Sequence, residues 1–125
     1  MENQYDKGRK MFLDLSGHEG EKLLEALRNA SPDLEKITME FPFGNIYQRE
    51  GLNIKQRELI TIAALTILGN AAPQLKIHVR MALTAGCTKA EITETILQMA
   101  VYGGFPCCLN AMIIAAEVFN QPEQA

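Results

Sequence analysis

Signals that begin and end helices recur along this chain, and they constrain its fold more than any other feature. Ser31 before Pro32 is a cap followed by a first-turn proline, and Pro73 and Pro106 open two later segments. Proline is tolerated there because it lacks only an amide hydrogen that the first turn leaves unpaired anyway. The sequence has no sustained period-2 alternation and no Asn-Gly or Asp-Gly hairpin turn. The chain is therefore expected to be all-α, with six or seven helices.

Apolar spacing and caps place these helices. A first helix is expected over about residues 3–15, ending near Gly17, and a short second one around residues 23–27. A third starts at Pro32 and should kink or stop at Pro42, because proline disfavours helix in the residue before it and removes a backbone donor. The remaining helices are expected over residues 54–68, 73–85, 88–103 and from 106 onwards, with capping boxes at Asn53–Gln56 and Thr88–Glu91.

Two of these helices carry patterns that assign their faces. The segment 54–68 is apolar on nearly every side, which is typical of a helix buried all round, and we place the core there. The apolar stripe of the last helix is expected to comprise Leu109, Met112, Ile113 and Ala116. Together they present more apolar surface than a chain of this size readily hides, which predicts a closed homo-oligomer.

The composition is that of one globular domain. The 125 residues include 12 basic and 15 acidic side chains, a net charge of −3, and 47% hydrophobic residues, enough to bury a core without disulfides or metals. We therefore expect a single domain over residues 1–125. The acidic balance gives no reason to expect a nucleic-acid or anionic-membrane partner, so small molecules and protein partners remain.

No targeting signal is recognisable, which predicts a cytoplasmic protein. The longest strongly apolar stretch, residues 59–68, has ten residues, well short of the ~20 that span a bilayer as a helix. The first residues lack the basic-then-apolar order of a secretory signal. Three cysteines form an odd set, so free thiols in a reduced compartment are the simplest account.

His78 and Glu58 are the strongest candidates for chemistry. His78 lies in the expected helix 73–85, and Glu58 lies one turn into a helix dominated by leucine, isoleucine and alanine. A carboxylate within reach of the imidazole, directly or through a water, would fix its tautomer and assist proton transfer. A packed histidine and a first-turn carboxylate beside the helix dipole stay open as alternatives. His18 is remote and no cluster has ligand spacing, so no metal is expected.

Cys107 and Cys108 directly follow Pro106 at an expected helix start, where the helix dipole can make a thiol more reactive. Neighbouring helix positions point about 100° apart, so we expect one of the two to pack in the core. A disulfide between them would strain the backbone. Cys87 sits in a turn and has no obvious partner.

A series of short motifs occurs in order along the chain. It comprises Phe43-Gly44-Asn45-Ile46-Tyr47-Gln48-Arg49-Glu50-Gly51-Leu52, Arg57-Glu58-Leu59-Ile60-Thr61-Ile62-Ala63, Leu75-Lys76-Ile77-His78-Val79-Arg80, Gly86, Thr88, Glu91-Ile92, Tyr102-Gly103-Gly104-Phe105-Pro106 and Asn110-Ala111. The series resembles the carboxymuconolactone decarboxylase family over roughly residues 41–119, and the order is more specific than any single motif.

The resemblance implies an all-helical domain of the alkylhydroperoxidase-D-like type that assembles as a homo-oligomer, typically a hexamer. One branch of the family carries Cys-x-x-Cys-x-x-x-His, preceded by a glutamate that takes part in a proton relay. Aligned on His78, the two cysteine places fall on Ala71 and Gln74. The redox centre of that branch is therefore missing.

The other branch decarboxylates 4-carboxymuconolactone without a cofactor, so the resemblance implies the same type of reaction. Carbon dioxide leaves when its bonding electrons spread into an unsaturated lactone carbonyl, and a carbon is then protonated. By analogy His78 donates the proton and Glu58 orients or tunes the imidazole. Arg80 or Arg57 fixes a carboxylate with its guanidinium fork.

Tyr47 and Arg49 lie in the first motif and are further implied substrate contacts. The same segment departs from the family pattern. Phe43 and Tyr47 stand where its decarboxylases usually have tryptophans, Asn45 replaces an aspartate, and Glu50 replaces a proline. The expected substrate is therefore 4-carboxymuconolactone or a related lactone or keto acid.

Two other functions stay open beside the decarboxylase. One is a thiol-dependent peroxidase or oxidoreductase that uses Cys107 or Cys108 in place of the missing pair. The other is an oligomeric binding protein that keeps the fold without turnover. Thiol reactivity tests the first, and ligand-dependent melting separates the second from an inert scaffold.

Overall fold

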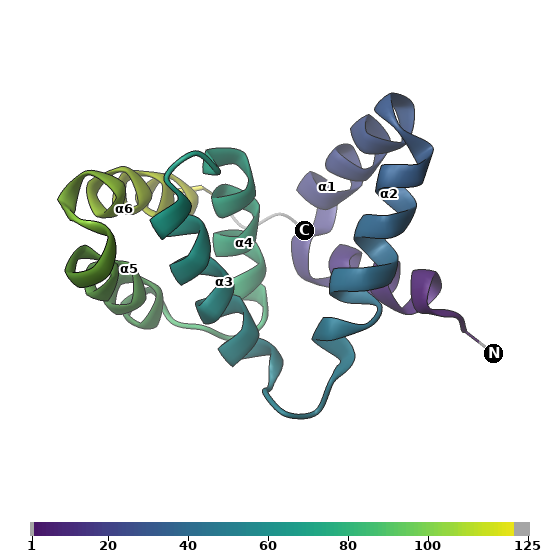
Figure 1. The fold of residues 1–125 in the computed structure, drawn as a ribbon, viewed down its shortest axis with the longest axis horizontal. Coiled ribbons are helices and arrows are strands. Elements are labelled where there is room, and N and C mark those ends of the chain that lie inside the picture. The colour runs from purple at the N-terminus through teal and green to yellow at the C-terminus, as the bar shows by residue number, and fades with distance from the viewer. Residues whose placement is uncertain (1, 122–125) are drawn as a thin grey trace. The chain divides into compact units, whose positions relative to one another are not determined.

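The fold, a computed structural model that describes residues 2–121, consists of helices joined by short connections and contains no strand in that range. This confirms the all-α prediction and the expected number of helices. Figure 1 shows the path of the chain. Its elements are α1 (Gln4–Ala30), α2 (Pro32–Thr38), a π-helical turn η1 (Met39–Phe43), a 3-10 turn η2 (Ile46–Gln48), α3 (Ile54–Leu68), α4 (Ala72–Thr84), α5 (Lys89–Gly103) and α6 (Phe105–Phe119).

The chain divides into two compact units at the start of α3. The first unit runs up to Asn53 and contains α1, α2, η1 and η2, and the second begins at Ile54 and contains α3 to α6. The expectation of one domain over the whole chain stays a prediction.

In the first unit, α1 is two helices in one element. Gly17 has φ 63° and ψ −140°, a backbone conformation that glycine adopts without penalty, so the helix breaks where the sequence predicts its end. Another glycine, Gly8, lets α1 approach η1, since a Cβ there would overlap the Met39 carbonyl. Phe12 of α1 packs on Phe43 with ring centroids 5.1 Å apart.

A buried carboxylate fastens α1 to α2. Glu35 is 3% exposed, and its Oε1 accepts hydrogen bonds from the Tyr5 hydroxyl at 2.6 Å and from Arg28 Nη2 at 3.3 Å. The bond to Glu35 raises the pKa of Tyr5. The carboxylate is thus both hydrogen-bonded and paired with a cation, as a buried charge requires.

The structure confirms the cap at the start of α2 and refines its end. Ser31 accepts a hydrogen bond from the amide of Leu34 at 3.2 Å, and Pro32 occupies the first turn. The α-helix ends at Thr38, and the chain continues as the π-helical turn η1, which contains Pro42. The wider turn accommodates the proline that was expected to kink or stop the helix.

In the second unit, the bounds of α3 match the prediction, and α4 and α5 match it within one residue at each end. Gly86 follows α4 with φ 104°, the left-handed conformation typical of a residue after a helix C-cap. α3 contacts all three other helices of this unit, and α6 packs on both α4 and α5. The core comprises Ile62, Leu75, Val79, Ala82, Cys87, Ile92, Ile96, Cys108, Ala111, Ala115 and Val118.

The prediction that α3 is buried on all sides is wrong for this unit. The buried residues of α3 are Glu58, Ile62 and Thr66, which follow each other at intervals of four and form one stripe. Ile60 is 55% exposed and Leu68 is 63% exposed. An apolar residue on a helix can be buried, but whether it is buried depends on which other helices pack against that side.

The predicted stripe of α6 is wrong for Leu109, Ile113 and Ala116, whereas Met112 packs against the core. The side that packs in the core consists of Cys108, Ala111, Ala115 and Val118, whereas the larger Leu109 and Ile113 are 59% and 62% exposed, and Ala116 is exposed and Met112 half-buried. Small side chains let α6 lie close to its neighbours, so packing distance rather than hydrophobicity selects the buried face.

The capping box at the start of α5 is confirmed and gives a pH-dependent stability. Thr88 Oγ1 accepts from the Glu91 amide at 3.0 Å, and Glu91 Oε1 accepts from the Thr88 amide at 2.8 Å. The hydrogen bond from the Thr88 amide lowers the pKa of Glu91 below its ordinary 4.5. A lowered carboxyl pKa stabilises the fold above the unfolded-state value, and this is lost as the pH falls through the folded-state value.

We therefore expect Glu91→Gln to unfold at lower urea than the parent protein near neutral pH, with the difference shrinking at pH values well below 4.5. Thr88→Ala should cost about 1 kcal/mol of unfolding free energy. Urea titration by circular dichroism at both pH values measures this. A Glu91→Gln difference that is unchanged at acid pH would contradict the assignment.

Candidate active site

Glu58 and His78 meet inside the second unit. Glu58 lies in the second turn of α3 and is 0% exposed. His78 lies in the middle of α4, and its side chain is 13% exposed. The distance from His78 Nδ1 to Glu58 Oε1 is 2.7 Å. The contact is direct, which answers a question that the sequence left open.

Their hydrogen bond assigns the two ring nitrogens different tasks. When Glu58 is ionised it can only accept hydrogen bonds, and His78 Nδ1–H is then the donor of this bond. The other ring nitrogen, Nε2, is then the one that can exchange a proton with a bound molecule. The arrangement holds the imidazole in one orientation, as second partners of catalytic histidines do.

Burial makes His78 important to Glu58 as well. Glu58 Oε2 is buried and has no hydrogen-bond partner among the described residues. The bond with His78 is therefore made by the other carboxylate oxygen, Oε1, alone. A buried carboxylate is costly unless it is paired and hydrogen-bonded. A positive charge on the imidazole would be compensated directly by this carboxylate.

The local sequence explains why a carboxylate occupies this place. The buried stripe of α3 consists of Glu58, Ile62 and Thr66. Glu58 is its first member, and the other two are an apolar and an uncharged polar residue. The alternative of a first-turn carboxylate beside the helix dipole does not describe Glu58, which lies past the first turn of α3 and bonds to His78 in the unit's interior.

The two arginines expected at the site have different surroundings. Arg80 Nη2 donates to the carbonyl of Val118 at 3.2 Å, in the last turn of α6, where the negative end of the helix dipole attracts cations. Arg57 precedes Glu58 on α3, and its Nε is buried. Arg80 thus has a structural task that ties α4 to α6.

Tyr47 and Arg49 belong to the first unit. The Tyr47 ring packs edge-on against Phe43 with centroids 5.0 Å apart, and Arg49 is exposed after η2. Glu58, His78, Arg57 and Arg80 all belong to the second unit. The implied substrate contacts of Tyr47 and Arg49 stay predictions.

All three cysteines are free thiols. Cys108 is buried and its thiol donates to the carbonyl of Ile96 at 3.4 Å, which confirms that one of the adjacent pair packs in the core. Cys107 is half-buried. Cys87 is buried, and burial together with the charge of Glu91 raises the pKa of its thiol.

Among residues 2–121 no group of three or more His, Cys, Asp or Glu side chains is arranged to hold a metal ion. None of the helices in that range has the length and apolar character needed to cross a membrane.

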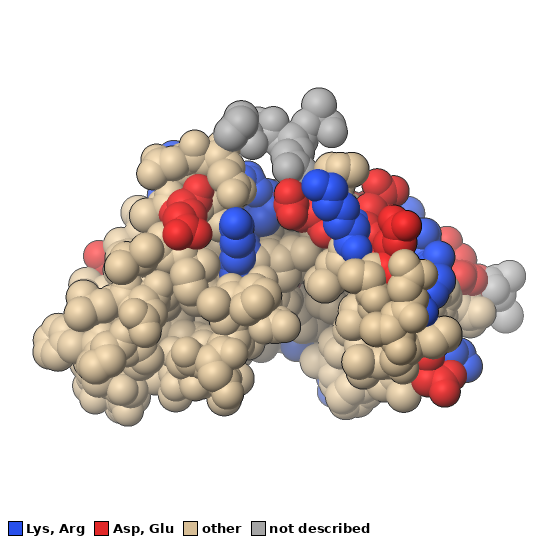
Figure 2. Space-filling view, turned by 90° about the horizontal axis from the view of Figure 1, so that it is seen from above, with Lys and Arg blue, Asp and Glu red and all other residues tan. Residues whose placement is uncertain are grey.

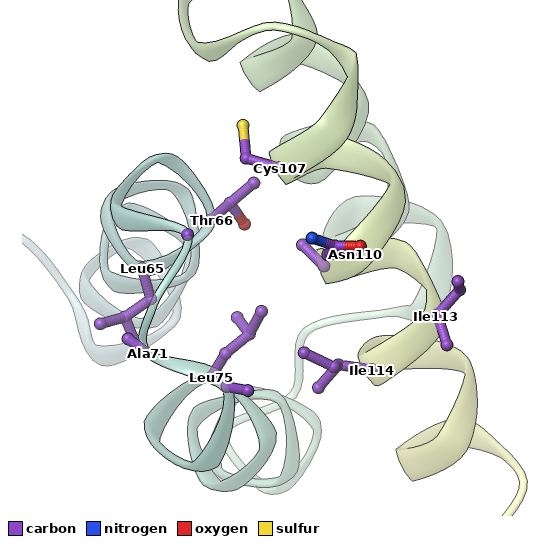
Figure 3. A pocket seen from close by; sticks show the side chains of 11 residues that line it. Leu65, Thr66, Ala71, Leu75, Cys107, Asn110, Ile113 and Ile114 are labelled. Carbon is purple, nitrogen blue, oxygen red and sulfur yellow. The ribbon is translucent and has the colours of Figure 1, made fainter.

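A feature that sequence reasoning missed is a cavity elsewhere in the second unit, among α3, α4 and α6 (Figure 3). Thr66 and Asn110 line it, and neither had been given a role. The signal that could have revealed it is the run of small residues from Gly69 to Ala72 that joins α3 to α4.

The sequence also matches known proteins. A family model described as "Carboxymuconolactone decarboxylase family" matches residues 32–117, more than half of the chain. The chain belongs to the carboxymuconolactone decarboxylase family, as its motifs predict.

Named relatives agree with this membership. A nitrosuccinic acid decarboxylase of Metarhizium robertsii is 39% identical over 93% of this chain and 81% of its own length. A 4-carboxymuconolactone decarboxylase of Acinetobacter baylyi is 34% identical over 95% of this chain and 89% of its own. An uncharacterised 15.0 kDa protein of Paracoccus denitrificans is 42% identical over 81% and 76%. These relatives support the expected enzyme class, a carboxy-lyase.

The thiols provide a test of the redox alternative. In the native protein we expect maleimide to modify Cys107 first, because Cys87 and Cys108 are 4% and 5% exposed and thiolates rather than thiols react. Timed alkylation with tandem mass spectrometry of the peptides measures the order. Faster reaction at Cys87 would contradict the described burial.

The matched functional test uses Cys107→Ser and Cys108→Ala. Both variants should keep any carbon dioxide release, since neither thiol belongs to the Glu58–His78 pair. A hydroperoxide reductase activity that is present in the parent and lost in these variants would favour the redox alternative.

Proposed function

We propose that this protein is a cofactor-free decarboxylase in which His78 donates a proton and Glu58 positions the imidazole. The observation that carries the proposal is the 2.7 Å bond between His78 Nδ1 and the fully buried Glu58. A carboxylate held against one ring nitrogen prepares the other for proton transfer. Membership of a decarboxylase family supports the reaction type.

The substrate class follows from chemistry that two named relatives share. In nitrosuccinic acid a carboxylate leaves a carbon that bears a nitro group, and in 4-carboxymuconolactone the electrons spread into an unsaturated lactone carbonyl. Both losses of carbon dioxide create a carbanion that a conjugated oxygen stabilises. We therefore propose a small carboxylic acid of this activated type, such as 4-carboxymuconolactone or a related lactone or keto acid.

The reaction needs one proton and no electron transfer. The bond between the substrate carbon and its carboxylate breaks, carbon dioxide leaves, and the electron pair delocalises onto the conjugated oxygen. His78 Nε2–H then protonates the carbon, leaving a neutral imidazole whose Nδ1–H still donates to Glu58. A proton from solvent restores the imidazolium, so the cycle closes.

Arg57 is the arginine that we propose for binding the substrate carboxylate. It adjoins Glu58 on α3, and a guanidinium binds a carboxylate with two parallel hydrogen bonds. Arg80 is the second candidate, and its guanidinium also donates to the Val118 carbonyl.

The cytoplasm is the compartment that we propose. The proposal is supported by the three cysteines, which are all free thiols in the structure. Free thiols are usual in proteins of reducing compartments.

Replacing His78 tests the mechanism. His78→Asn removes the titrating group but keeps a side-chain N–H that can donate to Glu58, so the melting temperature should change little. Turnover of an accepted acid should fall by roughly 10²–10⁴-fold, the usual loss of a general acid. Glu58→Gln should lower kcat less and move the pH profile, because it acts through the imidazole. The double variant should be less than additive.

Carbon dioxide release and circular dichroism measure these effects together. His78→Asn with full activity would overturn the mechanism and favour a binding protein. Lys76→Gln is the control, since Lys76 lies on the same helix and is exposed. It should keep both activity and stability.

We further propose that the protein assembles with copies of itself through the exposed side of α5 and α6. The left-hand end of Figure 2 corresponds to the part of the second unit where Figure 1 shows α5 and α6, and charged side chains are sparse there. Glu117 is the one charged residue of α6. The large apolar side chains of this side are 51% to 77% exposed, and they are Leu97, Val101, Tyr102, Phe105, Leu109 and Ile113. Contiguous apolar surface of this kind marks protein interfaces.

A single charge in this surface should weaken assembly. Leu109→Glu is expected to shift the protein to a smaller species in sedimentation velocity at micromolar concentration, because the interface would bury an unpaired charge. Leu34→Glu makes the same change at a 50% exposed position of α2 and should leave assembly intact. A monomeric parent protein would refute the proposal.

A further inference from the structure

A cavity of about 300 Å³ opens among α3, α4 and α6. Figure 3 shows it between the end of α3, the start of α4 and the side of α6 that carries Asn110 and Ile114. Neither Glu58 nor His78 lines it. It is therefore separate from the pair to which the decarboxylase mechanism is assigned.

Small residues create this space. Gly69 turns the chain with φ 74°, Ala71 and Ala72 begin α4, and Ala111 faces the cavity from α6 with 2% exposure. The space opens to the surface, because Gly69, Ala72 and Asn110 of its lining are exposed, and Ile113 at its rim also belongs to the surface proposed for self-assembly. This cavity could hold about ten water volumes of about 30 Å³ each.

The lining is apolar and uncharged. Leu75 and Ile114 form walls (Figure 3), and no Lys, Arg, Asp or Glu lines the cavity. Thr66 already donates its hydroxyl to a carbonyl of its own helix at 2.8 Å, and Cys107 donates its thiol to a carbonyl at the start of α6 at 3.3 Å. Asn110 is exposed and supplies an amide with both donors and an acceptor.

We propose that this cavity binds a small uncharged molecule with an apolar body and one hydroxyl or carbonyl group, which the Asn110 amide holds. A charged ligand would lose its hydration without meeting an opposite charge. The volume lies at the lower end of small-molecule sites, which limits the ligand to one or two rings. The site is independent of the decarboxylase reaction.

A pair of probes tests the charge preference. 2-Naphthol and 2-naphthoate share a ring system but differ in charge at neutral pH. We expect 2-naphthol to give a saturable fluorescence titration and 2-naphthoate to bind at least about tenfold more weakly. Equal affinity of the two probes, or no binding of 2-naphthol, overturns the proposal.

Two variants place the binding in the cavity. Ala72→Leu fills it from an exposed helix position and should weaken 2-naphthol binding at least about tenfold. Ala64→Leu adds the same side chain at an exposed position of α3 outside the cavity and should change nothing. Asn110→Leu, also at an exposed position, should weaken binding through loss of the hydrogen bond.

Cys107 reports on the same space, since it lines the cavity. Saturating 2-naphthol should slow its maleimide modification several-fold, and the same concentration of 2-naphthoate should not. Binding that is unchanged in both Ala72→Leu and Asn110→Leu overturns the proposal. A third result would also overturn it: the parent protein does not bind 2-naphthol, and the Ala72→Leu variant has a different sedimentation coefficient from the parent. In that case a second copy of the chain fills the cavity.

Discussion

The buried carboxylate of Glu58 is the constraint on which the second unit depends. A fully buried charge is tolerated only with a partner, and removing that partner typically costs about 3–5 kcal/mol. The imidazole of His78 supplies the partner at 2.7 Å and joins α3 to α4 in doing so. One contact therefore links the packing of α3 against α4 to the proton transfer that we propose for His78, and a change that abolishes it should disturb both.

The arrangement of α6 follows from a second constraint, the size of its buried side chains. Cys108, Ala111 and Ala115 are small, so this helix lies close to its neighbours. Arg80 of α4 then reaches the end of α6 and donates to the Val118 carbonyl. The larger apolar residues of α6 are left on the outside, where a second copy of the chain is the proposed cover.

The sequence predicted the elements better than the faces that they bury. Proline, glycine and capping signals act locally, so Pro32, Gly86 and the Thr88–Glu91 box placed the ends of helices correctly. Burial depends on which neighbours are present. Hydrophobicity alone therefore selected Leu109 and Ile113 for the core, although both are exposed.

For the candidate site, too, the sequence predicted some features and not others. Residue type and family motifs were enough to select Glu58 and His78, but a rise of 1.5 Å per residue placed them about 7 Å apart along the hairpin. Their long side chains close that gap, and backbone periodicity contains no information about this. The cavity beside Asn110 is lined by residues of three helices, and the small residues from Gly69 to Ala72 mark only the part of it between α3 and α4.

Proton delivery by His78 does not by itself select a substrate, because any activated carboxylic acid yields a carbanion that needs a proton. Selectivity must come from other side chains that contact the substrate. Phe43 departs from the family's usual tryptophan, but it is only 5% exposed and packs between Phe12 and Tyr47. It cannot present its ring to a substrate from that position. Its ring therefore serves the packing of the first unit, together with Tyr47, whereas the other two departures in this segment, Asn45 and Glu50, are exposed.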